Sequence, residues 1–224
     1  MGLEVLADIQ KEILIYLRDI PELDAFYLTG GTALSKFYLG HRRSNDLDFF
    51  TSEEELIQPF SLKIEEALKK AGFNVERKRG FHSFVELTVS AHSESTIIHL
   101  ALDSPYRLDS IVMAEEFPGL RIDSLRDIAA NKLLAIFGRA MLRDFVDVLF
   151  LVREKFEKND LILMAKKKDP GFDLYWLATA FERVHEFSAD SPETLLLVKP
   201  CSIEALSAFF DEWRREIFLE ITKK

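Results

Sequence analysis

The pattern of apolar residues changes near Ser124, and this change limits the folds that the chain can adopt. Before Ser124, segments with helical spacing alternate with short segments of strand character. After it, apolar residues recur at helical spacing as far as Ile221. We therefore expect an α+β protein. Residues 1–120 should form a mixed β-sheet flanked by helices, and residues 121–224 an all-helical subdomain that completes the cleft.

The expected elements follow from periodicity and from the residues that end helices and strands. In the first half we expect helices at residues 3–17, 32–39 and 54–71, and strands at residues 25–28, 47–51, 73–79, 81–89, 96–103 and 111–115. In the second half we expect helices at residues 124–139, 143–156, 161–168, 173–187 and 202–221. Gly80 separates two of the strand segments, so it is predicted to form the turn of a hairpin.

Composition excludes several classes of protein. The chain has 224 residues, of which 48% are hydrophobic and 30% charged, the balance of a soluble protein with a sizeable core. No apolar run approaches the roughly 18 to 20 residues that cross a bilayer, and the first residues lack the pattern of a signal peptide. We therefore expect a cytoplasmic protein without membrane association. The single cysteine, Cys201, excludes an internal disulfide and a cysteine-based zinc site.

The charge balance argues against a protein that coats nucleic acid through a broad basic surface. Lys and Arg number 29 against 38 Asp and Glu, which gives a formal net charge of -9. Basic clusters at Arg42–Arg43, Arg77–Arg79 and Lys166–Lys168 still allow a local basic cleft. A solvated surface is the simpler interpretation, and we favour it for the lysine cluster. Arg42 and Arg43 precede an acidic strand, where they could instead contact a triphosphate or a nucleic-acid acceptor.

Two glycines, Gly30 and Gly31, lie between a predicted strand and a predicted helix. Because glycine has no Cβ, the backbone can turn sharply here and a phosphate can approach the amide groups. The dipole of the helix that begins at Thr32 would favour that anion. A glycine pair also occurs in ordinary tight turns, so the residues that follow it decide its meaning.

An Asp-Leu-Asp sequence occupies the next predicted strand. Asp46 and Asp48 share one face of this strand, about 6.6 Å apart along the chain, whereas Leu47 points into the core. Neighbouring carboxylates repel each other unless a cation lies between them. The strand at 96–103 offers a third acid, Asp103, whose alternative role is that of a turn residue before Ser104 and Pro105. His99 shares the face of Asp103 and is expected to be a core residue or a residue that supports the site, rather than a metal ligand.

The stretch GGTALSKFYLGHRRSNDLDFF resembles the first motif of the AbiEii/AbiGii-type toxin nucleotidyltransferases, a branch of the DNA polymerase beta-like superfamily. Two later stretches, Asp127 to Arg139 and Arg143-Asp144-Phe145-Val146-Asp147, resemble the lysine-containing helix and the Arg-Asp-x-x-Asp helix of this family. Many superfamily members carry Gly-Ser where this chain has Gly30-Gly31. A hydroxyl contact to phosphate would therefore have to come from Thr32 or be absent.

The resemblance implies magnesium-dependent transfer of a nucleoside monophosphate from a nucleoside triphosphate to an acceptor hydroxyl, with release of pyrophosphate. By analogy, Asp46 and Asp48 would hold two Mg²⁺ ions, and Asp103 would complete the catalytic one and could receive the acceptor proton. Two cations can stabilise both the attacking and the leaving oxygens of an in-line displacement. The triphosphate would be held by Gly30, Gly31 and Thr32, together with Arg43.

Lys132 lies one helical turn after Ile128 on an apolar stripe, and Arg139 follows two turns later. A lysine on an inward-facing stripe needs an anion, and the proposed anion is the triphosphate. The alternative is an ion pair with Asp144 or Asp147, which lie beside the apolar stripe of the next helix. Both interpretations of Lys132 can be correct if an acidic side chain orients the lysine between turnovers. We count all four as candidate site residues, with Lys132 and Asp147 in catalytic roles.

The aromatic residues Tyr175, Trp176 and Phe181 have helical spacing. Such spacing is typical of residues that pack in a core. We therefore expect a core cluster here and not a base-stacking surface.

The sequence leaves three functions open. The resemblance implies an active toxin of a toxin–antitoxin pair, with an RNA such as transfer RNA as acceptor and a cognate antitoxin as partner. A non-catalytic module that binds a nucleotide or a protein is the second possibility, and the presence of all three acids counts against it. A transferase that modifies a small molecule, such as an antibiotic hydroxyl, is the third.

Overall fold

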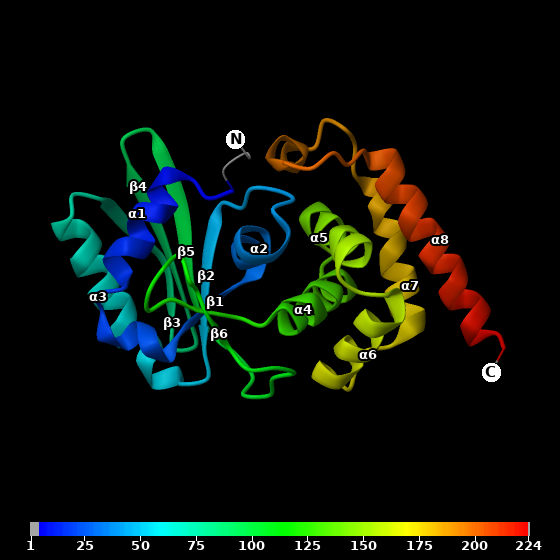
Figure 1. Cartoon of the computed structure of the whole chain (residues 1–224), viewed down its shortest axis with the longest axis horizontal. Coiled ribbons are helices and arrows are strands. Elements are labelled where there is room, and N and C mark those ends of the chain that lie inside the picture. Colours follow the sequence, from blue (N-terminus) through cyan, green and yellow to red (C-terminus); the bar gives the residue numbers. More distant parts are fainter. Residues whose placement is uncertain (1–4, 224) are drawn as a thin grey trace. The chain divides into compact units, whose positions relative to one another are not determined.

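The computed structural model describes residues 5–223, and the contacts within the chain divide it into two compact units (Figure 1). The first unit comprises Met1–Tyr38 and Arg43–Ser124, and the second Leu39–Arg42 and Leu125–Lys224. The domain boundary predicted between residues 120 and 121 stays a prediction. Among the described residues, every helix is too short or too polar to span a bilayer.

A seven-stranded mixed sheet forms the centre of the first unit, in the order β3-β4-β5-β2-β1-β7-β6. Its strands are β1 (Tyr27–Thr29), β2 (Asp46–Thr51), β3 (Asn74–Phe81), β4 (Phe84–Ala91), β5 (Glu94–Leu102), β6 (Val112–Met113) and β7 (Arg121–Ile122). Strand β2 pairs in parallel with β5 and antiparallel with β1, which in turn pairs in parallel with β7. The α+β class and the mixed sheet are therefore confirmed.

Helices cover both faces of this sheet (Figure 1). Helices α1 (Asp8–Leu17) and α3 (Ile57–Lys70) lie on one face, where Leu47, Phe49 and Leu100 are fully buried. Helix α2 (Gly30–Leu34), which continues as a π-helical turn over Ser35–Leu39, lies on the other. Burial alternates along β2, so its two aspartates point to the α2 side while Leu47 enters the core, as predicted.

The second unit is built from helices α4 (Leu125–Gly138), α5 (Leu142–Glu154), α6 (Lys158–Lys168), α7 (Leu174–Phe181) and α8 (Ile203–Ile221), with 3₁₀ turns at Glu182–Glu186 and Pro192–Leu196. Its core is aromatic: Phe210 lies 4.8 Å from Phe145 and 4.9 Å from Phe181, measured between ring centroids. Asp173 caps α7 by accepting hydrogen bonds from two backbone amides, and Ser202 caps α8 by accepting one from the amide of Ala205. The predicted succession of helices is confirmed.

Three predictions about local structure need correction. Gly80 does not form a turn: it lies within β3 opposite Val85, and the hairpin turns at residues 82–83 because β3 continues to Phe81, which pairs with Phe84. Tyr175 and Trp176 are not core residues, since they are 51% and 60% exposed and α7 buries Leu177, Ala178 and Phe181 instead. Strand β7 was not expected, because two residues are too short for a recognisable alternation.

Candidate active site

A row of polar side chains crosses the α2 side of the sheet at one level. Thr29 of β1 lies opposite Asp48 of β2, Asp48 opposite His99 of β5, and His99 opposite Glu86 of β4. Directly paired residues point to the same face, so these four side chains are neighbours. Asp123, the residue after β7, extends the row, because its Oδ2 accepts a 2.7 Å hydrogen bond from Thr29 Oγ1.

The glycine bend is pressed against this row. Gly30 has a φ of +71°, and a Cβ at this position would lie 2.1 Å from Asp48 Oδ2. Both the backbone conformation and the lack of space therefore require glycine. The glycine bend and the Asp-Leu-Asp strand are therefore in direct contact at Asp48.

This contact predicts a specific effect of the Gly30→Ala substitution. The Cβ would displace the Asp48 carboxylate, and a misplacement of about 1 Å in an active site can lower the rate roughly 10²-fold. A left-handed alanine also costs about 1–2 kcal/mol of folding free energy. We expect transfer activity to fall about 10²-fold, measured with a labelled nucleotide.

Gly72→Ala is the matched control for Gly30→Ala. Gly72 has a φ of +92°, but no atom lies within 4 Å of the position that a Cβ would take there. The control should therefore lose similar stability, measured by urea unfolding, and keep its activity. Equal activity of the two variants would show that the space beside Asp48 is unimportant.

His99 holds Asp48 from the neighbouring strand. Its Nδ1 lies 2.8 Å from Asp48 Oδ1, and both side chains are about four-fifths buried. Burial alone would lower the pKa of His99, but the hydrogen bond to Asp48 and the charges of Asp48, Asp46 and Glu86 together raise it. The carboxylates on this face therefore create a negative potential that stabilises a cation.

Asp103 lies at another level of the sheet. Its backbone amide donates a 2.8 Å hydrogen bond to the carbonyl of Thr51, and its carboxylate accepts a hydrogen bond from the hydroxyl of Tyr27. Since His99 is the residue level with Asp48, Asp103 lies four residues farther along, or about 13 Å at the rise of a strand. The structure therefore does not bring Asp103 beside Asp46 and Asp48.

The network around Asp103 explains its position. The guanidinium group of Arg107 lies 4.5 Å from the ring centroid of Tyr27 and also pairs with Asp123. Burial and the hydrogen bond to Asp103 raise the pKa of Tyr27, so its hydroxyl remains a donor. Within residues 5–223, no three acidic, histidine or cysteine side chains are grouped so that they could hold a metal ion. The catalytic role of Asp103 stays a prediction, without support from the register.

The other residues of the first unit that were predicted to contact the triphosphate differ in how accessible they are to a ligand. The hydroxyl of Thr32 is buried and donates to the backbone carbonyl of Asp46. A hydroxyl contact from Thr32 to phosphate would require this bond to break, which leaves the backbone amides of the bend as the donors for phosphate. Gly31 is buried beneath the bend, and Arg43 is exposed just before β2.

A second cluster, which we call the Asp147 cluster, lies within the second unit and consists of Asp147, His41, Arg42, Lys132 and Asp144. Asp147 is fully buried, and Arg42 binds both of its carboxylate oxygens, at 2.6 Å and 2.8 Å. His41 Nε2 lies 2.7 Å from Oδ1, and Lys132 Nζ lies 2.9 Å from Oδ2. Burial would raise the pKa of Asp147, but the charges of Arg42 and Lys132 and the hydrogen bonds from Arg42 and His41 hold it well below the usual 3.8.

Lys132 joins Asp147 to Asp144. Its Nζ lies 3.4 Å from Asp144 Oδ1, and Asp144 also accepts two hydrogen bonds from Arg139, at 2.9 Å and 3.0 Å. The ion pair that was the alternative for Lys132 is thus present. A contact between Lys132 and a triphosphate stays a prediction, as do the roles of Arg139, Asp144 and Asp147 in the reaction.

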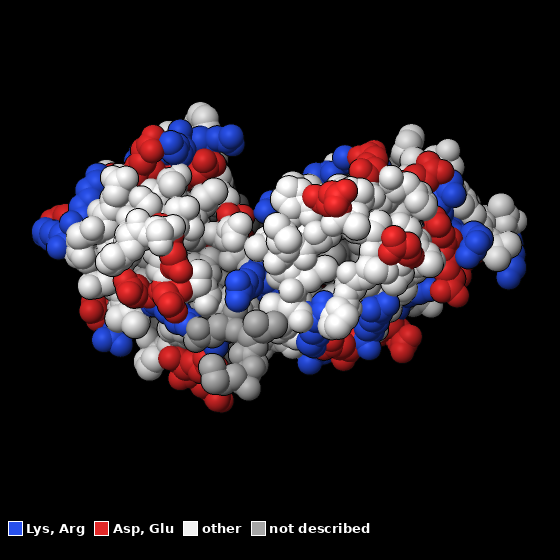
Figure 2. Space-filling model, turned by 90° about the horizontal axis from the view of Figure 1, so that it is seen from above, with Lys and Arg blue, Asp and Glu red and all other residues white. Residues whose placement is uncertain are grey.

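Each basic cluster contains a side chain that is paired with an acidic residue of the chain. Arg42 is buried against Asp147, Arg77 donates a 2.7 Å hydrogen bond to Glu65, and Lys168 lies 2.9 Å from the buried Asp127. Lys166 and Lys167 are exposed, as predicted. On the face seen in Figure 2, acidic and basic side chains are interspersed.

Sequence reasoning missed several residues of these two clusters. Asp123 is 1% exposed and ends the polar row, but its position depends on the pairing of the unpredicted β7 with β1. The neighbours His41 and Arg42 are buried because the segment 39–42 is held by the amides of Val198 and Lys199, both 2.9 Å from the carbonyl of His41. No local pattern in the sequence signals either contact.

The fold is that of known nucleotidyltransferases. The chain is similar to a putative nucleotidyltransferase from Helicobacter pylori, with a TM-score of 0.58 and 19% identity, over 97% of this chain and 98% of that one. It is also similar to MenT4, a nucleotidyltransferase toxin from Mycobacterium tuberculosis, with a TM-score of 0.57 and 18% identity, over 94% of this chain and 82% of that one.

The family follows from the sequence comparison. Residues 13–199 match the model of the AbiEii family, described as nucleotidyl transferase toxins of type IV toxin–antitoxin systems. The chain therefore belongs to this family and is a toxin-type nucleotidyltransferase. It is also 29% identical to an uncharacterized protein of Aquifex aeolicus over 186 residues, which cover 79% of this chain and 85% of that protein.

Proposed function

We propose that this nucleotidyltransferase moves a nucleoside monophosphate from a nucleoside triphosphate to a hydroxyl of an RNA, such as transfer RNA, in a magnesium-dependent reaction. The observation that carries the proposal is the contact between Gly30 and Asp48. It places a bend without side chains, where a phosphate can approach, against a carboxylate that shares its strand face with Asp46. Substrate phosphate and metal-binding oxygens would meet there.

The residues present fit a hard divalent cation. Mg²⁺ prefers carboxylate oxygens and is commonly bound through one or two carboxylates together with substrate phosphates. Asp46 and Asp48 supply that number of side chains on one face of β2, and Glu86 lies on the same face of the sheet opposite His99. We propose that these two aspartates hold the two Mg²⁺ ions with help from the triphosphate. Mg²⁺ bound there would polarise the phosphate and lower the pKa of the acceptor hydroxyl.

The residues of the chain would position the reactants. The backbone amides of the glycine bend would bind the triphosphate, and His99 would fix the rotamer of Asp48. The acceptor oxygen forms a bond to the α-phosphorus while the bond to the pyrophosphate oxygen breaks, and the hydroxyl proton is released. In the second unit, Lys132 and Arg139 remain our candidates for further triphosphate contacts, with Asp144 and Asp147 orienting them.

We further propose that the enzyme acts in the cytoplasm and is opposed by a cognate antitoxin. The support is membership of a family of toxin–antitoxin systems. A small-molecule transferase remains the second candidate, since the Gly30–Asp48 contact suits any acceptor hydroxyl.

The test is transfer of label from each α-labelled nucleoside triphosphate, with total RNA, with purified transfer RNA, or without RNA. We expect labelled RNA only when Mg²⁺ is present and none after chelation with EDTA. Label on a small molecule in the reactions without RNA would favour the second candidate. Magnesium-dependent binding of a triphosphate without any transfer would instead indicate a non-catalytic module.

Asp103→Asn tests whether a third acid contributes. Because Asp103 lies about four strand residues, or roughly 13 Å, from the level of Asp48 and accepts from Tyr27, we expect less than a tenfold loss of transfer. The loss of one hydrogen bond to a charged group should cost about 1.5–3 kcal/mol of stability, measured by urea unfolding. Loss of transfer as complete as in Asp48→Asn would establish the three-acid site predicted from the sequence.

A further inference from the structure

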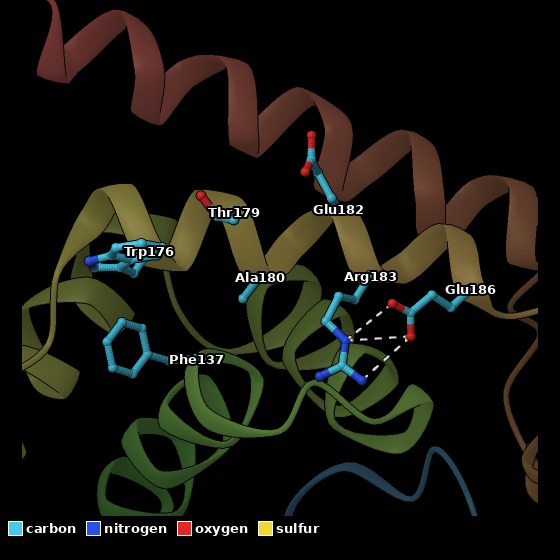
Figure 3. A pocket seen from close by; sticks show the side chains of 7 residues that line it. All are labelled: Phe137, Trp176, Thr179, Ala180, Glu182, Arg183 and Glu186. Carbon is cyan, nitrogen blue, oxygen red and sulfur yellow. Dashed lines mark hydrogen bonds and ion pairs between the residues drawn. The ribbon is translucent and has the colours of Figure 1, made fainter.

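A pocket of about 540 Å³ lies within the second unit, between α4 and α7. Its lining residues are Phe137, Trp176, Thr179, Ala180, Glu182, Arg183 and Glu186 (Figure 3). The rings of Phe137 and Trp176 lie at one end of it, and Arg183 and Glu186 at the other. This volume falls within the roughly 300–1,000 Å³ that is usual for small-molecule sites.

Trp176 is the unusual member of this lining. Its side chain is 60% exposed, although a large aromatic side chain gains free energy from burial. The ring of Phe137 beside it is itself held in place by Phe172, at 5.2 Å between ring centroids. An accessible indole next to a fixed phenyl ring is an arrangement that suits stacking with a flat ligand.

The charged side chains of the lining are all paired. Arg183 pairs with Glu186, with Nε 3.3 Å from Oε1, and is held further by a 2.6 Å hydrogen bond from Nη1 to the carbonyl of Arg139. The side chain of Glu182 points away from Arg183 (Figure 3), and it pairs with Arg214 of α8. Because each charged side chain of the lining already has a partner of opposite charge, neither a phosphate nor a basic side chain is the ligand that this lining favours.

We propose that this pocket binds an uncharged nucleobase, with the base stacked against Trp176 and Phe137 and its edge at Arg183 and Glu186. Arginine donates to base acceptors such as O6 and N7 of guanine, and a carboxylate accepts from amino groups, so the pair matches an edge that carries both. Ala180 leaves room along the wall of the pocket. The source of the base rests on the proposed function. It is either a free nucleotide or an unpaired base of the RNA acceptor.

The binding test uses guanosine, which has no phosphate, and equilibrium dialysis without a divalent cation. We expect saturable binding that Trp176→Ala weakens about tenfold, because a base gains binding energy by stacking on an aromatic side chain. Tyr106→Ala is the matched control, because Tyr106 is an aromatic residue that is 50% exposed and does not line the pocket. Circular dichroism would check that both variants are folded.

Tryptophan fluorescence gives an independent reading, since the chain has two tryptophans and the second, Trp213, is only 1% exposed. Guanosine should quench the wild-type emission and leave that of Trp176→Ala unchanged. A single-stranded RNA oligonucleotide that competes with guanosine would identify RNA as a source of the base, whereas the same sequence in a duplex should not compete. Competition by guanosine triphosphate alone would identify the free nucleotide.

Three results would overturn the proposal: no saturable binding of guanosine, equal binding by Trp176→Ala and Tyr106→Ala, or Trp176-dependent binding of an arginine-rich peptide in place of guanosine. Because binding is measured without metal and without turnover, Asp48→Asn should bind guanosine as the wild type does. If the protein binds guanosine but transfers no nucleotide, the proposed function alone is refuted. If it transfers nucleotide but does not bind guanosine, this inference alone is refuted.

Discussion

Asp48→Asn is expected to reduce nucleotide transfer about 10³-fold while the protein remains folded. The substitution keeps the volume of the side chain but removes the negative charge that faces Gly30 and His99. Metal ions supply several kcal/mol of charge stabilisation to such transition states, and about 4 kcal/mol corresponds to 10³ in rate. The measurement is the initial rate of label transfer at saturating triphosphate.

Asp190→Asn is the control for charge and residue type, because Asp190 is exposed in a loop of the second unit. It should transfer label at the wild-type rate. If Asp48→Asn did so as well, the polar row of the sheet would not be the site of the reaction.

Asp147→Asn is expected to produce the largest loss of stability, about 3 kcal/mol at pH 7. Arg42, His41 and Lys132 converge on this fully buried carboxylate, and removing one partner of a buried ion pair typically costs about 3–5 kcal/mol. The measurement is urea unfolding of the wild type and the variant, with the free energy of unfolding extrapolated to water.

The loss of stability caused by Asp147→Asn is expected to depend on pH. The folded-state pKa of Asp147 lies below its ordinary value of 3.8, so its ionised form stabilises the fold above that value, and the contribution fades as the pH falls through the folded pKa. The difference between wild type and variant should therefore be constant from pH 7 to about pH 5 and should shrink below about pH 4. A difference that is small at pH 7, or that grows in acid, would contradict the ion-pair geometry.

The parts of the site that depend on neighbouring residues were predictable from the sequence. The alternation along β2 places Asp46 and Asp48 on one face whatever the strand pairs with, because successive side chains point to opposite faces. The glycine bend was recognisable because it lies between a strand and a helix. Most helices were predictable for the same reason, since their apolar periodicity and caps are local.

The parts that depend on register were not predictable. Alternation along β5 gave the face of Asp103 but not its level, which is set by the pairing of Asp46 with Ile97. The burial of Arg42 depends on Asp147, which is 105 positions away in the chain. Trp176 has the spacing of a core residue, yet the short helix α7 buries a different face.

The proposed function depends on one property above all: the carboxylates beside the glycine bend must bind a divalent cation together with the triphosphate. The most direct test is electron paramagnetic resonance of Mn²⁺, titrated into the protein with a non-hydrolysable nucleoside triphosphate analogue. We predict binding by the wild type and by Asp190→Asn, and at least tenfold weaker binding by Asp46→Asn and Asp48→Asn. Mn²⁺ binding that is equally strong in all four proteins would contradict the claim.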